Sequence, residues 1–260
     1  MDGTGSAERP KTRRTVGRQR PAAPAPDLPQ HFYRTASLPC PYLEGRIERK
    51  LVTELRGYDA GRFYNELSRG GFRRSHHLAY RPACAGCSAC VPARIVAPLF
   101  VAGRSLRRVA ARNADIRVRV VAARASFDQY RVFVRYQHAR HPESEMAAMS
   151  FGDYRAMIED SPVETFFLEA RGTDDQVMGG CLVDLLDDGL SAVYSFYDPG
   201  EGGRSLGSYL ILALVAEAQR RAMPYVYLGY WIAGSPKMGY KARFRPLEGL
   251  GPQGWRLVDP

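Results

Sequence analysis

Short runs of apolar residues, separated by turn-forming residues, dominate the second half of the chain. Three such runs lie at residues 163–170, 177–186 and 190–196. Their length and their β-branched and aromatic content predict buried strands, and Asp187-Asp188-Gly189 suits a hairpin turn between the last two. A long helical segment follows at residues 204–222, and residues 225–231 return to a strand pattern.

The first half of the chain gives a more mixed pattern. Residues 59–69 predict a helix that stops at Gly70-Gly71, residues 72–76 a loop, and residues 91–101 a strand. Residues 46–55 suit a strand or a helix equally well. Further helices are predicted at residues 105–113, 126–141 and 151–158.

The order strand, strand, glycine-containing turn, helix, strand in the second half is that of an acetyltransferase-type core. We therefore predict an α+β protein with an acetyltransferase-like (GNAT-type) mixed sheet core and an N-terminal α+β sub-domain that carries a cysteine cluster. The expected divisions are a disordered basic tail at residues 1–30, the N-terminal sub-domain at 31–103, the catalytic domain at 104–248 and a C-terminal tail at 249–260.

The net charge of +10 is unevenly distributed along the chain. Residues 40–125 hold 17 Lys and Arg against 6 Asp and Glu, whereas residues 126–204 hold 6 against 15. Two basic segments that flank an acidic one indicate a polyanionic partner. Within the first segment, residues 105–113 predict a basic helix whose arginines either follow phosphates or are simply solvated.

No run of residues approaches the ~18 apolar residues of a membrane span, and the N-terminus has cations without an apolar core, unlike a secretory signal. We therefore expect a cytoplasmic protein with no membrane partner.

Three cysteines, Cys84, Cys87 and Cys90, lie within seven residues, and Cys40 is the remaining thiol that could join them. In a reducing cytoplasm such a cluster is more often a metal site than a set of disulfides. Four thiolates suit zinc, and the three-cysteine run also resembles half of an iron–sulfur loop. Zinc, an iron–sulfur cluster and a set of thiols without metal all remain open. Cys181 lies in an apolar run and is expected in the core.

Residues 225–245 combine aromatic rings with four cations and no acidic residue. Rings can stack on bases while cations neutralise phosphates, so the segment suits an anionic ligand that carries a base. A core strand followed by a solvated basic helix is the alternative.

The turn before the long helix contains Arg204, Ser205 and Gly207. Free N–H groups at a helix N-terminus favour phosphates. In acetyltransferases that use coenzyme A this turn reads Arg/Gln-x-x-Gly-x-Gly/Ala, and here Tyr209 occupies the last small position. The bulky ring speaks against coenzyme A.

Long blocks of the sequence resemble the arginyl-tRNA–protein transferase family. The C-terminal blocks are GGCLVDLLDDGLSAVYSFYDP and GYWIAGSPKMGYKARFRP, and the N-terminal blocks are FYRTASLPCPYLEGRIERKLVTEL and YNELSRGGFRRSHHLAYRPACAGCSACVPARI. The N-terminal blocks are similar to the bacterial branch, the aspartate/glutamate leucyltransferases. The resemblance covers residues 32–246.

This resemblance implies an aminoacyltransferase that moves leucine from leucyl-tRNA to the N-terminal α-amine of proteins beginning with Asp or Glu, which marks them for N-degron degradation. The amine attacks the ester carbonyl, and the ribose hydroxyl of the terminal adenosine leaves. Because an α-ammonium has a pKa of roughly 7.7–8.0, no strong base and no cofactor are required for the chemistry. Orientation and desolvation can do most of the work.

Within this chemistry, Asp184 is expected to hold or deprotonate the amine, or else to form a structural salt bridge. Tyr194, Ser195 and Tyr197 lie at the strand end, where they can bind the ester or the adenosine. The acceptor stem is assigned to Tyr230, Lys237, Tyr240 and Lys241, with both lysines on one helical face. Arg73 and Arg74 are assigned to the acidic N-terminus of the acceptor protein, because Arg pairs bidentately with carboxylates.

Three alternatives remain. Arginine from arginyl-tRNA could be the transferred residue, since the leucine assignment rests on the resemblance alone. The other two are a coenzyme-A-dependent N-acetyltransferase and a non-enzymatic RNA-binding module with a cysteine ribbon.

Overall fold

The computed structural model describes residue 1 and residues 30–258 of the chain. The tail predicted at residues 1–30 lies almost entirely outside this range. No helix in the described part is long and apolar enough to cross a membrane.

A mixed sheet of eight strands forms the centre of the protein, in the order β14-β13-β7-β12-β11-β10-β9-β8. All neighbours are antiparallel except β11 and β12, which are parallel. The strands are β7 Val91–Val96, β8 Arg117–Ala122, β9 Thr165–Arg171, β10 Val177–Leu186, β11 Gly189–Tyr197, β12 Tyr225–Trp231, β13 Leu247–Gly251 and β14 Gly254–Leu257. The predicted α+β class with a large mixed sheet is thus confirmed.

Helices cover both faces of this sheet, because side chains of buried strands alternate between two apolar layers. Leu168 and Val183 face α2 (Arg104–Arg112) and α5 (Leu206–Arg220). Their neighbours Phe167 and Leu182 face α3 (Phe127–Arg140) and α4 (Phe151–Glu159). Ser126 and Ser150 begin α3 and α4 with complete capping boxes, which fixes where these helices start.

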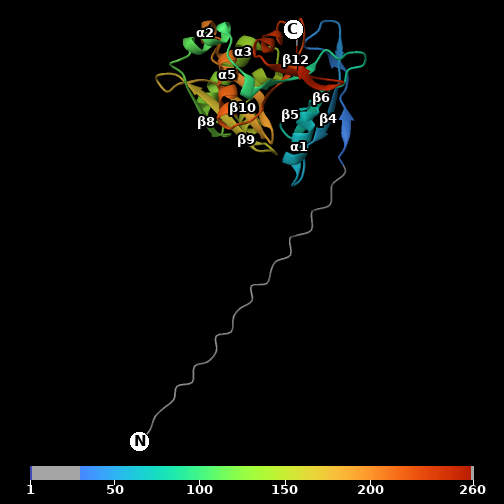
Figure 1. Cartoon of the computed structure of the whole chain (residues 1–260), viewed down its shortest axis with the longest axis horizontal. Helices are drawn as coiled ribbons and strands as arrows, with labels where there is room; N and C mark the ends of the chain where they lie inside the picture. The colour runs from blue at the N-terminus through green and yellow to red at the C-terminus, as the bar shows by residue number, and fades with distance from the viewer. Residues whose placement is uncertain (2–29, 259–260) are drawn as a thin grey trace. The chain divides into compact units, whose positions relative to one another are not determined.

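A second sheet of four antiparallel strands, β1-β4-β6-β5, lies beside the large one together with α1 (Ala60–Arg69) (Figure 1). Its strands are β1 Phe32–Arg34, β4 Lys50–Glu54, β5 Arg73–Ser75 and β6 Leu78–Pro82. Tyr64 of α1 and Ala79 of β6 share an apolar core with Leu186 and Tyr227 of the large sheet. The two sheets are therefore packed into one unit.

The remaining elements are short. β2 (Leu38–Pro39) and β3 (Ile47–Glu48) pair with each other. In the part of the chain that the structure describes, 3₁₀ turns occur at Ala97–Leu99, Glu145–Ala148, Pro199–Arg204 and Gly239–Arg243, labelled η1 to η4.

The parallel strands β11 and β12 pair at one end only. Their register runs from Gly189 opposite Tyr225 to Ser191 opposite Tyr227 and then stops, although both strands continue. Each strand also carries an irregularity near this point: Val193 is an extra residue opposite β10, and the register of β12 against β7 shifts between Tyr227 and Gly229. Such bulges bend strands, and here they accompany an opening between β11 and β12.

The strands and the long helix predicted for the second half agree with the structure. The loop predicted at residues 72–76 is wrong, because Arg73–Ser75 pair with β6 as β5. β7 lies before the predicted boundary at residues 103 and 104 and is nevertheless a strand of the large sheet. Residues 249–257, expected in a tail, contribute to β13 and β14.

Arg94 holds β7 in this sheet by a stack of cation–π contacts. Its guanidinium carbon lies 3.4 Å from the ring centre of Tyr225 and 4.2 Å from that of Trp255. Arg94 also donates to Glu248 over 2.8 Å and to the Tyr227 hydroxyl over 3.1 Å. Side chains from β7, β12, β13 and β14 are thus tied to one cation, which sequence-local patterns could not reveal.

Candidate active site

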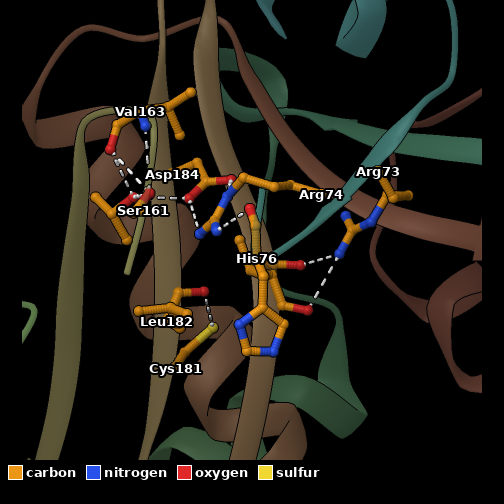
Figure 2. Close-up of polar contacts among 11 residues, drawn as sticks. Arg73, Arg74, His76, Ser161, Val163, Cys181, Leu182 and Asp184 are labelled. Carbon is orange, nitrogen blue, oxygen red and sulfur yellow. Dashed lines mark hydrogen bonds and ion pairs between the residues drawn. The ribbon is translucent and has the colours of Figure 1, made fainter. Parts of the chain in front are cut away.

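The opening between β11 and β12 is occupied by the side chain of Arg73, which reaches it from β5. Its Nη2 donates to the main-chain carbonyls of Ala192 and Val193, which have no partner on β12 (Figure 2). On the other side lies Gly229, with a φ of 76°, where an added Cβ would stand 3.1 Å from the Arg73 guanidinium carbon. The Nη1 atom of Arg73 is buried and has no hydrogen-bond partner among the described residues. An unused donor therefore points into a buried part of the site.

Lys241, from η4, is the second cation at this opening. It is 5% exposed, and its Nζ donates to the main-chain carbonyl of Tyr230. Burial, and then the charge of Arg73, lower the pKa of this amine to about 7, against a smaller raising effect of Cys90. Lys241 can therefore exchange a proton near neutral pH. Lys237 is exposed, so the two lysines do not share one face.

A group of tyrosines borders the same opening. Tyr136 of α3 and Tyr197 of β11 have ring centres 4.9 Å apart in an edge-to-face arrangement. Burial raises the pKa of the Tyr136 phenol, and the nearby phenols of Tyr194, Tyr197 and Tyr240 raise it further. Tyr240 is 40% exposed, so its ring remains accessible to a ligand.

Gln137 of α3 completes the buried polar groups here. Its Nε2 donates to the Tyr194 hydroxyl over 2.5 Å, and its Oε1 is buried without a partner in the described chain. Ser195, on the same strand as Tyr194 and Tyr197, is exposed. β11 thus brings the three predicted residues to one strand end, as expected, and α3 adds partners that were not predicted.

Arg140, His141 and Lys237 lie near the tyrosines at the edge of this opening. The guanidinium of Arg140 lies 5.9 Å from the ring centre of Tyr197, and the His141 ring lies 5.7 Å from that of Tyr136. Burial, then the charges of Lys237 and Arg140, lower the pKa of His141. Within the described chain, neither Arg140 nor Lys237 forms an ion pair. Tyr136, Gln137, Arg140 and His141 carry no local motif, and only the packing of α3 on β11 reveals them.

Arg74 and Asp184 lie together but away from any accessible surface. Arg74 donates from Nε and Nη2 to the two carboxylate oxygens of Asp184 over 2.8 and 2.7 Å, and the side chains are 1% and 0% exposed (Figure 2). Thr165 donates to the same carboxylate over 3.0 Å. Although burial lowers it, the hydrogen bonds and charge of Asp184 raise the pKa of Arg74 overall.

This pair bears on the roles expected for Asp184 and Arg74. Of the two roles left open for Asp184, the structural salt bridge is the one that the geometry supports. Arg74 is not available for an acceptor carboxylate, because Asp184 already takes its bidentate face. Tyr230 is also engaged, since it is buried with its hydroxyl 3.1 Å from the carbonyls of Gly71 and Tyr80, and its ring is not free to stack.

The turn before α5 is held by α2 and does not stand free. Arg204 donates to Asn113 Oδ1 over 3.0 Å and forms an ion pair with Asp115. Ser205 has a φ of 57° at the start of α5, and an added Cβ on Gly207 would stand 3.0 Å from the Tyr197 ring. Ser205 and Gly207 therefore lie beside the opening, whereas Arg204 positions their loop.

Tyr209 fills the position that is small in coenzyme-A enzymes. Its hydroxyl donates to the carbonyl of Ile116 over 3.2 Å, and its ring packs in the cluster formed by Ile116, Ala170, Met178, Leu206 and Leu210. The bulky residue is thus part of the core packing.

The four clustered thiols lie within electrostatic range of one another. Burial, and then the charges of Cys40, Cys84 and Cys87, raise the pKa of Cys90 to about 11. The Arg49 N–H donates to Cys84 Sγ over 3.4 Å. Within the described range, no three His, Cys, Asp or Glu side chains are arranged so that they could already hold a metal ion. Cys181 is buried in the core, as expected.

Sequence comparisons place most of the chain in two family models. Residues 38–108 match "Arginine-tRNA-protein transferase, N terminus" and residues 128–251 match "Arginine-tRNA-protein transferase, C terminus". Among curated proteins, the aspartate/glutamate leucyltransferase of Paramagnetospirillum magneticum is 56% identical over 89% of this chain and 95% of its own length. That of Gluconacetobacter diazotrophicus is 54% identical over 90% of each chain.

Among solved structures, L-PGS from Bacillus licheniformis superposes with a TM-score of 0.49 at 10% identity, over 62% of this chain and 58% of its own.

Replacing Asp184 by Asn should lower the free energy of unfolding by about 3–5 kcal/mol, because Arg74 would keep a buried charge without a counter-ion. Urea denaturation measures this. A double variant that also carries Arg74→Met should recover part of the loss. Arg62→Gln, on the exposed face of α1, is the control and should change stability little. A loss below ~1 kcal/mol for Asp184→Asn would contradict the role of this pair.

Lys241 should make stability depend on pH in a defined direction. Its pKa is about 7 in the folded protein and 10.5 in an unfolded chain, so between these values the unfolded state binds the extra proton and stability rises with pH. The free energy of unfolding of the wild type, minus that of Lys241→Met, should therefore increase from pH 7 to pH 10. A difference that stays flat would show that the buried amine keeps its ordinary pKa.

Proposed function

Because this chain belongs to the arginine-tRNA-protein transferase family, we propose that it transfers leucine from leucyl-tRNA to the N-terminal α-amine of proteins that begin with Asp or Glu. Family membership identifies it as a transferase enzyme, and neither the acetyltransferase nor the non-enzymatic RNA-binding alternative is favoured. Leucine follows from the names of the relatives. A cytoplasmic location, where charged tRNA is found, and a role in N-degron degradation belong to the same proposal.

The observation that carries the proposed site is the opening between β11 and β12, where Nη1 of Arg73 has no partner among the residues that the structure describes. Nη2 of Arg73 is already bonded to two carbonyls, and both bidentate faces of a guanidinium require Nη2. Arg73 can therefore donate a hydrogen bond from Nη1 to a single oxygen, but it cannot form two parallel hydrogen bonds to a carboxylate. We assign it to the carbonyl oxygen of the leucyl ester, where negative charge develops as the amine attacks.

The attacking amine must lose a proton, and the ribose oxygen must gain one as it leaves. Asp184 is committed to Arg74, so Lys241 replaces it as the candidate proton acceptor. An amine with a pKa of about 7 is roughly half neutral at physiological pH. It lies within electrostatic range of Arg73, which disfavours its charged form.

The aromatic and cationic groups around the opening suit the 3′ end of the tRNA. Accessible Tyr240, with Tyr136 and Tyr197, can stack on the terminal adenine, while Tyr194 and Ser195 line the path of the ester. The main-chain N–H groups of Ser205 and Gly207 can donate hydrogen bonds to a phosphate. We assign the acceptor's carboxylate to Arg140 and Lys237, which form no ion pair with the described residues.

Incubation with charged tRNA and peptides tests the proposal directly. Leucyl-tRNA should add one leucine to peptides that begin with Asp or Glu and none to those that begin with Lys or Ala, as read by mass spectrometry. Arg73→Lys should reduce kcat by roughly 100-fold, the order of one lost oxyanion donor. Transfer of arginine from arginyl-tRNA instead would overturn the donor, and transfer from neither would overturn the reaction.

We further propose that Cys40, Cys84, Cys87 and Cys90 hold a structural metal, either zinc or an iron–sulfur cluster. Mutual repulsion of the thiolates, which contributes to the raised pKa of Cys90, is what a bound cation would relieve. The N–H donors of Arg49 and Ala89 support thiolates at Cys84 and Cys87. The metal would fix the loop that follows β6 and would take no part in the transfer.

Anaerobically purified protein should then contain about one zinc per chain, or the iron of one cluster, by elemental analysis. Cys90→Ala should remove most of this metal, whereas Cys181→Ala, in the core and outside the cluster, should leave it. Zinc and iron that together fall well below stoichiometry would contradict the proposal.

A further inference from the structure

The exposed side of α2 carries a row of arginines that the proposed transfer site does not use. Leu106 and Val109 face the core, while Arg104, Arg108 and Arg112 are all exposed. They are spaced by four residues, so successive positions rise by about 6 Å along one side of the helix. None of them forms an ion pair within residues 30–258.

This row is physically continuous with the transfer site. Arg112 donates to the carbonyl of Gly203, and Asn113 Nδ2 donates to the carbonyl of Arg204 over 2.9 Å. Both carbonyls lie in the loop that leads into α5, where Gly207 approaches the ring of Tyr197. The C-terminal end of α2 is therefore anchored beside the opening, and the row of cations extends away from it.

We propose that this face of α2 binds the sugar–phosphate backbone of the acceptor stem, next to the aminoacyl end held at the opening. The inference rests on the proposed function, since it needs an RNA whose 3′ end lies between β11 and β12. Evenly spaced cations without acidic partners suit one strand of phosphates, and they position the RNA without reading its sequence. The surrounding segment is basic throughout, with 17 Lys and Arg against 6 Asp and Glu in residues 40–125.

The double variant Arg104→Gln/Arg108→Gln tests this surface and leaves Arg112, which holds the α5 loop, in place. Affinity for uncharged tRNA should fall roughly tenfold at physiological salt, and the slope of log K against log salt should become shallower by about 1 for each arginine removed. Transfer from leucyl-tRNA should show a raised KM and an unchanged kcat. Transfer from leucyl-adenosine, which lacks the stem, should match the wild type.

Arg62→Gln/Arg155→Gln is the matched control, because it removes from α1 and α4 two exposed arginines that form no ion pair with any described residue. It should leave both the affinity and the salt slope unchanged. Equal loss with leucyl-tRNA and leucyl-adenosine would mean that α2 acts only through the structure of the site, and an equal loss in the control would mean general charge attraction; either result overturns the inference.

Two further outcomes separate this inference from the proposed function. In the first, no donor supports transfer, but the α2 variant still weakens tRNA binding and changes its salt slope. This result would support the RNA-binding surface and contradict the proposed reaction. In the second, the variant binds tRNA normally but no longer binds phosphatidylglycerol vesicles. This result would mean that the surface binds a membrane, and the inference would be wrong.

Discussion

The buried pair of Arg74 and Asp184 is the interaction on which the arrangement of the two sheets depends. It joins β5 of the small sheet to β10 of the large one at a point closed to water. Because side chains alternate along a strand, fixing Arg74 on one side of β5 directs Arg73 to the other, into the opening between β11 and β12 (Figure 2). A buried contact between the two sheets thus decides where Arg73, the proposed donor to the ester oxygen, lies.

The opening itself results from strands that begin as partners and then part. Val193 is an extra residue in β11, and Gly229 holds a backbone conformation that side chains disfavour. Arg73 donates to the main-chain carbonyls of Ala192 and Val193, which have no partner on β12. The opening therefore leaves neither carbonyl without a hydrogen bond. Tyrosines from α3 and β11 then form one wall, and Lys241 stands near the same cation.

Local patterns in the sequence were sufficient for β10, β12 and α5, because each is long and strongly periodic. They failed at residues 72–76, where two adjacent arginines suggested an exposed loop, whereas Arg73–Ser75 form a hairpin with β6, the next strand along the chain. They also could not predict that Asp184 forms a buried ion pair whereas Lys241 is a buried amine with a lowered pKa. Burial and partners depend on contacts between remote segments. The same holds for His141 and Gln137, which reach the site only through the packing of α3. The family resemblance, by contrast, rested on long contiguous blocks and could be read directly.

Tyr209 has a consequence for how this fold changes its substrate over evolution. Its half-buried ring packs against Ile116, Met178 and Leu210, so the residue that distinguishes this helix start from that of coenzyme-A enzymes also supports the core. A change to a small residue would remove these contacts and lower the stability before any new ligand could compensate for the loss. A change from one class of donor to the other therefore requires that the residues around Tyr209 be repacked at the same time. Single substitutions would tend to preserve the existing donor.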